Sequence, residues 1–134
     1  MERMKTWKGI WKSEDEMMTL TYIAKFDAAH FLPDYVGPCG NLHGHTWRVE
    51  VEIAGSPNPE TGMIVDFKEI KTVLEAILPD HTLLNTHPLL AEIKFPTAES
   101  LSLIFFYEIK KSFPGLRRVT VWESDHASAS YVES

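Results

Sequence analysis

Residues 43–54, with the sequence HGHTWRVEVEIA, decide the fold because they alternate between two kinds of side chain. One set is mostly apolar, and the other carries hydroxyl or charged groups. The first set comprises His43, His45, Trp47, Val49, Val51 and Ile53, and the second comprises Thr46, Arg48, Glu50 and Glu52. Successive side chains of a strand point to opposite faces of a sheet. The pattern therefore predicts an antiparallel strand with one buried and one solvated face.

Three further stretches predict the strands that complete a sheet. Leu20–Phe31 precedes the first stretch, and its even positions place apolar residues and His30 on one face. A loop rich in proline and glycine, residues 32–42, joins the two. Near the C-terminus, Arg117–Ser124 and Ala127–Val132 predict a second pair of strands.

Two helices are expected between the strand pairs. Asp66 and Glu69 have the spacing of a capping box and precede apolar residues at helical intervals, and Pro79 ends the run. Thr97 is a favourable N-cap for a second helix, which we expect to end near Ser112. The order β-β-α-α-β-β predicts an α+β fold in which two helices cover one face of an antiparallel sheet.

The composition is that of one globular domain. The chain has 134 residues, of which 44% are apolar and 24% are charged. Its formal net charge of −6 argues against a nucleic-acid partner, because that binding depends on a basic surface. A single cysteine, Cys39, excludes an intramolecular disulfide and favours the reducing cytoplasm. No stretch is long and apolar enough to predict a membrane span.

The first 16 residues are expected to be an N-terminal extension outside the core, with residues 17–134 as one domain. They mix lysines with acidic residues and contain no apolar run of the kind found in signal peptides. The adjacent Met17 and Met18 mark the boundary, and either is an alternative start of the chain.

Histidines at the predicted strand junction suggest a metal site. His43 and His45 are two residues apart on one strand, so their imidazoles project from the same face. His30 ends the preceding predicted strand and arrives beside them if the two strands pair. Three neutral imidazoles are a ligand set that suits Zn²⁺. The alternative is that these residues are core histidines that continue the apolar face.

The residues also leave three roles open. Cys39 is either a fourth ligand of a closed structural site or a free thiolate beside an open one. Asp80 and His81 are either a carboxylate–imidazole pair for proton transfer or an ordinary turn after the helix. Glu123 lies on an apolar strand face, where a carboxylate must meet a cation, accept hydrogen bonds from a ligand, or pair with a nearby arginine.

Taken together, these residues resemble the family of 6-pyruvoyl-tetrahydropterin synthase and 6-carboxytetrahydropterin synthase, which has the tunnelling fold (T-fold). The resemblance spans residues 19–132. It consists of an ordered set of short motifs. These are Phe26-Asp27-Ala28-Ala29-His30, the run Cys39-x-x-x-His43-x-His45, Gly62-Met63-Ile64-Val65-Asp66-Phe67, Asp80-His81, Pro96-Thr97-Ala98-Glu99 and Glu123.

The resemblance implies a zinc-dependent lyase and assigns a role to each motif. Zn²⁺ is held by His30, His43 and His45. Cys39 is the catalytic base, and Asp80 and His81 complete the proton-transfer set, donated in this family by a neighbouring subunit. Glu123 anchors the pterin through hydrogen bonds from its 2-amino and ring N–H groups, and Glu99 is a second substrate-binding residue. The expected assembly is a homo-oligomer, a hexamer of two stacked trimers.

Within the family, three residues between Cys39 and His43 are typical of the carboxy-forming branch. The resemblance then implies conversion of 7,8-dihydroneopterin triphosphate to 6-carboxy-5,6,7,8-tetrahydropterin, with release of acetaldehyde and triphosphate, on the route to queuosine and other 7-deazaguanines. Lys25 and Lys68 are candidate triphosphate contacts. The alternatives are a 6-pyruvoyl-tetrahydropterin synthase, a non-enzymatic zinc-stabilised binding domain and, more remotely, a zinc hydrolase.

Overall fold

The computed structural model describes residues 7, 9–11 and 17–133 and consists of a sheet covered on one face by two helices. The strands are β1 (Met18–His30), β2 (His43–Gly55), β3 (Thr82–Leu83), β4 (Leu116–Trp122) and β5 (Ser128–Val132). The helices are α1 (Phe67–Ile77) and α2 (Ala98–Lys110), and three 3-10 turns are η1 (Pro38–Gly40), η2 (Leu84–Thr86) and η3 (Pro88–Leu90). The predicted α+β fold class is confirmed, with one further short strand, β3, between the two helices.

The sheet has the strand order β3-β1-β2-β4-β5. Four of these strands were predicted, and all pairs among them are antiparallel. The sequence did not predict β3, which pairs parallel to β1 at Ala28 and Ala29 and makes the sheet mixed. A strand of two residues is too short to carry a period-two pattern, so a sequence reading misses it.

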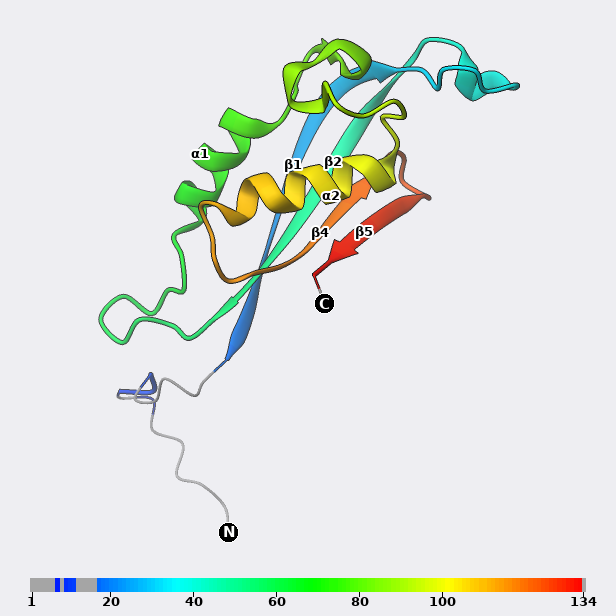
Figure 1. Ribbon diagram of the computed structural model, residues 1–134. Coiled ribbons are helices and arrows are strands. Elements are labelled where there is room, and N and C mark those ends of the chain that lie inside the picture. The colour runs from blue at the N-terminus through cyan, green and yellow to red at the C-terminus, as the bar shows by residue number, and fades with distance from the viewer. Residues whose placement is uncertain (1–6, 8, 12–16, 134) are drawn as a thin grey trace.

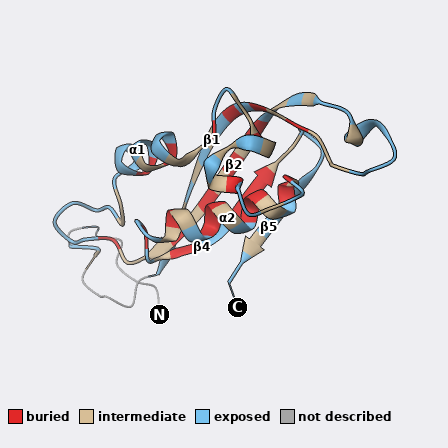
Figure 2. Ribbon diagram, turned by 45° about the horizontal axis from the view of Figure 1, so that its top comes forward, coloured by how far each residue is buried: buried red, intermediate tan, exposed pale blue. Residues whose placement is uncertain are grey.

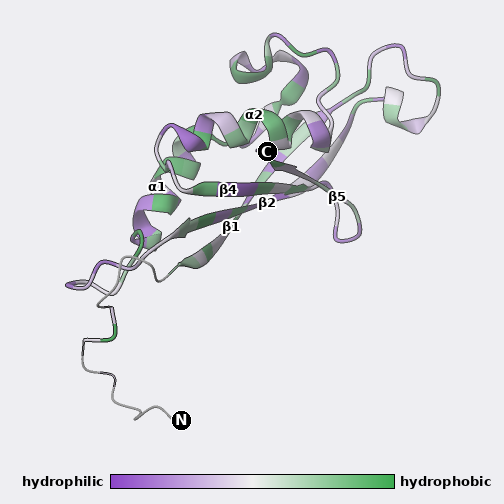
Figure 3. Ribbon diagram, turned by 60° about the horizontal axis from the view of Figure 1, so that its bottom comes forward, coloured by the Kyte–Doolittle hydropathy of each residue, from purple (hydrophilic) through white to green (hydrophobic). Residues whose placement is uncertain are grey.

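Both helices lie on the same side of the sheet, as the nearly edge-on view in Figure 3 shows. Asp66 caps α1 by accepting from the backbone N–H of Lys68 at 2.9 Å, and Thr97 caps α2 by accepting from that of Ser100 at 3.2 Å. Both N-caps were predicted. The last helical residue of α2 is Lys110, two positions before the predicted end.

The core fills the space between the sheet and the helices, and Figure 2 shows buried residues on β2, β4 and α2 facing one another. Trp47, Phe26 and Phe105 are among the largest of its fully buried side chains. The Phe26 ring stacks on Trp47 at 6.0 Å and meets Phe105 edge-on at 5.8 Å. These aromatic rings lie next to the ends of β1 and β2, so they form a rigid base for the residues there.

Two strand edges of the sheet have no partner within the described residues. One is the outer edge of β5, and the other consists of β3 together with the part of β1 that precedes its pairing with β3. Unpaired edges present free backbone N–H and C=O groups to a neighbouring strand.

The predicted N-terminal extension falls mostly outside the described residues. Of its described part, Trp7, Gly9, Ile10 and Trp11 line a hollow together with Pro59 and Gly62 of the loop between β2 and α1. Figure 1 shows this loop at the end of the sheet opposite the turn of the β1–β2 hairpin. Among the described residues, the helices are all too short or too polar to cross a bilayer.

Candidate functional site

Three histidine side chains meet where β1 ends and β2 begins. His30 and His43 are register partners, and His45 is opposite Ala28. All three therefore project from the same face of the hairpin. The ring centroids of His30 and His43 lie 4.5 Å apart, those of His30 and His45 lie 5.1 Å apart, and those of His43 and His45 lie 4.8 Å apart. The structure thus brings together the three imidazoles that the sequence singled out.

Main-chain carbonyl groups fix the orientation of two of these rings. Nδ1 of His30 donates to the carbonyl oxygen of Pro96 at 2.7 Å, and Nδ1 of His43 donates to that of Asn41 at 2.7 Å. A ring with its proton on Nδ1 presents a lone pair at Nε2. Both rings are therefore held in the tautomer that ligates a metal ion through Nε2.

The ring nitrogens at the centre of the cluster lack hydrogen-bond partners. Nε2 of His30 and Nε2 of His45 are buried and unpaired within the described part of the chain. Burial lowers the pKa of both imidazoles, more than the nearby Glu123 carboxylate raises it. The rings are therefore neutral near pH 7, and their lone pairs are available. A cation at the centre would satisfy these otherwise costly atoms, so the residues present fit a metal ion.

Glu123 completes this group from the position directly after β4. With the three histidines it forms a set of four whose candidate ligand atoms all lie within 4.8 Å of one another. Oε1 of Glu123 lies 3.0 Å from Nε2 of His45 and 3.7 Å from Nε2 of His30, without hydrogen-bond geometry to either. The side chain is 32% exposed. The carboxylate is thus placed either to ligate an ion or to receive a ligand that enters from solvent.

Cys39 lies outside the group of four. It is exposed and occupies the middle of the η1 turn, in the loop between β1 and β2. Its carbonyl oxygen accepts from the backbone N–H of Leu32 at 2.9 Å, which closes the loop. The next residue must be glycine, because a Cβ on Gly40 would collide with the carbonyl oxygen of Tyr35. With Glu123 as the fourth member of the group, the geometry favours a free thiol over a fourth ligand.

Asp80 and His81 form a pair on the outer edge of β1. Oδ2 of Asp80 lies 2.9 Å from Nδ1 of His81. Asp27 holds both residues, since its N–H donates to Oδ1 of Asp80 at 2.8 Å and its carbonyl oxygen accepts from the N–H of His81 at 2.6 Å. His81 adopts a left-handed backbone conformation with φ 57°, which is uncommon outside glycine. The Asp27 hydrogen bond and then the His81 imidazole lower the pKa of Asp80, so its carboxylate remains ionised.

A shallow hollow of about 570 Å³ lies over β3, the end of β1 and the start of β2. Its lining includes Gly44, His45, Thr46 and His81. His45 is a member of the group of four, and His81 belongs to the pair. One open hollow is therefore bordered by both sets of candidate functional residues.

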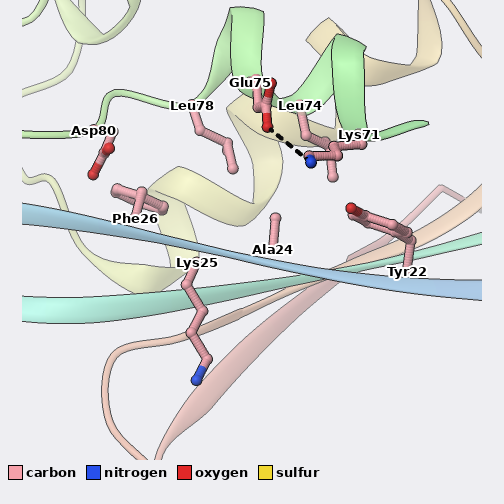
Figure 4. Close-up of a pocket in the computed structure, with 9 residues that line it drawn as sticks. All are labelled: Tyr22, Ala24, Lys25, Phe26, Lys71, Leu74, Glu75, Leu78 and Asp80. Carbon is pink, nitrogen blue, oxygen red and sulfur yellow. Dashed lines mark ion pairs between the residues drawn. The ribbon is translucent and has the colours of Figure 1, made fainter. Parts of the chain in front are cut away.

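A second hollow of about 480 Å³ lies between α1 and β1 (Figure 4). Its walls are mainly apolar, and Lys71 and Glu75 form an ion pair at 3.9 Å on its α1 side. Asp80 lies at one end of this hollow, and its neighbour His81 borders the first one. Lys25 extends from β1 away from α1. Of the two lysines considered as triphosphate contacts, Lys25 thus points away from this hollow.

Glu99 is not brought into the cluster. It is exposed in the first turn of α2, and its carbonyl oxygen accepts from Oγ of Ser102 at 2.8 Å. Its carboxylate forms no hydrogen bond or ion pair with the described residues.

Comparison with known families gives a match along most of the chain. The model of the family described as 6-pyruvoyl tetrahydropterin synthase matches residues 19–134, which contain every candidate site residue. The chain belongs to the 6-pyruvoyl tetrahydropterin synthase family.

Three curated relatives match the chain over most of their own length. A putative 6-carboxy-5,6,7,8-tetrahydropterin synthase from Archaeoglobus fulgidus is 37% identical over 113 residues, which are 83% of this chain and 92% of that protein. The 6-carboxy-5,6,7,8-tetrahydropterin synthase of Synechocystis is 34% identical and is covered to 86%, with 79% of this chain matched. A dihydroneopterin monophosphate aldolase from Pyrococcus furiosus is 30% identical and is covered to 90%, again with 79% of this chain matched.

The fold agrees with a solved structure of the 6-pyruvoyl tetrahydropterin synthase family. The Caenorhabditis elegans 6-pyruvoyl tetrahydropterin synthase superposes with a TM-score of 0.82, over 91% of this chain and 99% of that chain, at 24% identity. The T-fold expected from the sequence is thereby confirmed.

Sequence reasoning missed the groups that hold the site residues in place. The carbonyl groups of Pro96 and Asn41 and the main chain of Asp27 act through the backbone, so their residue types gave no signal. Asn85 is different, because its side chain binds the main chain of Phe31. The sequence signal that could have indicated this contact was a polar amide directly after the apolar pair Leu83-Leu84, close to the Asp80-His81 motif.

Proposed function

We propose that this protein is a zinc-dependent lyase, a 6-carboxy-5,6,7,8-tetrahydropterin synthase. It converts 7,8-dihydroneopterin triphosphate to 6-carboxytetrahydropterin and releases acetaldehyde and triphosphate. The observation that carries the proposal is the gathering of three imidazoles around one centre, with Cys39 outside the ligand group. Relatives named for this reaction, at 37% and 34% identity, support the choice of substrate.

His30, His43 and His45 would hold the zinc ion through their Nε2 atoms. When bound, the ion supplies Lewis-acid polarisation of the substrate's side-chain oxygens, which makes the adjacent C–H groups more acidic. The fully buried Trp47 packs against the rings of His30 and His45 and keeps water away from that side of them.

Cys39 acts as the base that removes a proton from the substrate side chain through its Sγ. A thiolate close to a divalent cation is stabilised relative to the thiol, which suits this role. The exposed turn that carries Cys39 leaves Sγ open to a ligand that approaches from solvent.

Asp80 and His81 return protons during the reaction. Oδ2 of Asp80 accepts from Nδ1 of His81, which leaves Nε2 of that ring free to exchange a proton with the substrate. The ionised Asp80 carboxylate also stabilises the imidazolium that forms when the ring accepts a proton.

Glu123 anchors the pterin by accepting hydrogen bonds from its 2-amino and ring N–H groups. A carboxylate offers two acceptors in one plane, which matches two adjacent donors. The partial exposure of Glu123 supports access for a ligand. Glu99 is the weaker candidate, because its carboxylate lies at the surface of α2.

The working protein is a cytoplasmic homo-oligomer, a hexamer of two trimers, built from the domain that spans residues 17–134. Two unpaired sheet edges support an assembly in which strands of neighbouring copies pair. In such an assembly the Asp80–His81 pair of one copy serves the metal centre of another. The product supplies a route to 7-deazaguanines such as queuosine.

One incubation tests the proposal against its alternatives. The zinc-loaded protein is mixed with 7,8-dihydroneopterin triphosphate, the pterin product is identified by mass, and acetaldehyde is assayed. 6-Carboxytetrahydropterin with acetaldehyde is expected. A pyruvoyl pterin without acetaldehyde would assign the other branch, and turnover of 7,8-dihydroneopterin monophosphate alone would favour the aldolase seen in a 30% identical relative. No product from either substrate would favour a zinc-stabilised binding domain.

A further inference from the structure

Asn85 makes a two-point contact with the main chain of β1 just beyond the strand's end. Its Oδ1 accepts from the N–H of Phe31 at 3.0 Å, and its Nδ2 donates to the carbonyl oxygen of Phe31 at 2.9 Å. Both bonds are partly buried. Together they reproduce the pair of backbone bonds that a neighbouring strand would make.

This contact is the last in a continuous row of contacts along one edge of β1. The edge begins where Asp27 binds Asp80 and His81, and it continues through the pairing of β3 with Ala28 and Ala29. At Leu84 the main chain turns into η2 and leaves the strand. Beyond that point the side chain of Asn85, in place of the main chain, makes the next pair of hydrogen bonds along this edge.

Phe31 lies between two parts of the proposed site. The residue before it is His30, whose side chain is buried at 3% exposure with its Nδ1 bound to Pro96. The residue after it is Leu32, whose N–H closes the loop that carries Cys39. The position of the Phe31 main chain therefore determines the position of His30 and that of the first residues of the loop that carries Cys39.

We propose that Asn85 is a positioning residue for the metal centre, and that it fixes the main chain next to His30. This inference rests on the proposed function. The segment from Asp80 to Asn85 is held against β1 at both ends, by the contacts of Asp27 at one end and by those of Phe31 at the other. Loss of the Asn85 contact releases the end that lies next to His30.

The alternative is that Asn85 only stabilises the fold. Substitutions that change groups orienting a metal ligand lower metal affinity or activity by about 10–100-fold. A contact that only stabilises the fold lowers the melting temperature and leaves metal affinity unchanged. Zinc affinity therefore separates the two roles without any substrate.

The experiment compares Asn85→Ala and Asn85→Asp with Asn58→Ala in the full chain. Asn58 is a matched control, because its Oδ1 also accepts a backbone N–H, that of Glu60 at 2.8 Å, in an exposed loop remote from the histidines. Zinc affinity is measured by competition with a chromophoric chelator, and the visible spectrum of the Co²⁺-loaded protein reports ligand geometry. kcat and KM are measured at saturating zinc.

We expect Asn85→Ala to weaken zinc binding about 10–100-fold and to change the Co²⁺ spectrum. Asn85→Asp, which keeps the acceptor for Phe31 N–H and loses the donor, should weaken binding less. Asn58→Ala should match the wild-type chain. At saturating zinc, Asn85→Ala should lower kcat and leave KM within about threefold.

The inference is overturned if the Asn85→Ala chain folds and has the same zinc affinity and Co²⁺ spectrum as the wild-type chain, even if its melting temperature falls. If Asn85→Ala does not fold, unchanged zinc affinity in Asn85→Asp overturns it instead. The proposed function fails separately, through absence of pterin product in the wild-type chain. A zinc-affinity difference would then still support the positioning role.

Discussion

His30 and Pro96 are 66 positions apart in the sequence, yet Nδ1 of the histidine donates to the proline carbonyl oxygen at 2.7 Å. Proline has no N–H, and its carbonyl group directly precedes the N-cap of α2. The start of the second helix therefore sets the tautomer of a residue at the end of the first strand. This link makes the histidine cluster a long-range feature of the folded chain.

Zinc should raise the melting temperature of the protein, and His30→Ala should abolish most of this increase. A ligand that binds only the folded state stabilises it by about 4 kcal/mol at 1,000 times its Kd. The check is a thermal scan with and without zinc after chelation. His87→Ala is the control, since its ring Nδ1 only accepts from Leu89 in η3. An equal zinc response in His30→Ala would rule out this ligand.

Cys39→Ala should keep zinc and lose turnover. Because Cys39 lies outside the group of four, its removal leaves the ligand set intact. Loss of a positioned base lowers kcat by about 10²–10⁴-fold. Mass spectrometry measures whether the variant keeps its zinc. The kcat on dihydroneopterin triphosphate measures whether turnover is lost. Loss of zinc together with unfolding would instead identify Cys39 as a structural ligand.

Glu123→Gln should raise KM for the pterin by about 10-fold or more while zinc affinity stays within about twofold, because a neutral amide accepts weaker hydrogen bonds than a carboxylate. Steady-state kinetics and zinc competition are measured on the same preparation. Glu99→Gln is a useful comparison, since that carboxylate lies at the surface. A large fall in zinc affinity in Glu123→Gln would make Glu123 the fourth ligand, as its distance from His45 allows.

The zinc-free protein should lose stability as the pH falls below about 6.5, the ordinary imidazole pKa. Burial lowers the pKa of His30 and His45 in the folded state, so below that pH the unfolded chain binds more protons. Stability then declines by at most about 1.4 kcal/mol per pH unit for each histidine, until the lowered pKa is passed. Urea unfolding between pH 8 and 5.5 measures this slope, which His45→Gln should reduce. A slope unaffected by His45→Gln would contradict the assignment.

The sequence predicted the parts of the fold that have a repeating pattern. Alternation located β2, and the capping residues Asp66 and Thr97 located the starts of both helices. It did not predict β3, because two residues carry no period. Nor did it predict that β4 ends at Trp122, which places Glu123 past the strand and beside the histidines.

For the candidate site, spacing along the strands was informative and contacts through the backbone were not. The two-residue spacing of His43 and His45 fixed a shared face in advance. The carbonyl group that orients His43 belongs to Asn41 and has no residue-specific signal. The roles of Cys39 and Glu123 relative to a metal ion depended on three-dimensional distances, so the sequence left them open.

The pairing of His30 with His43 has a consequence for how such proteins can change length. An insertion of one residue between His43 and His45 would place their two side chains on opposite faces of the sheet. An insertion between residues 31 and 42 would leave all three imidazoles where they are. A change in the number of residues between Cys39 and His43 would therefore move the sulfur atom and leave the three imidazoles in place.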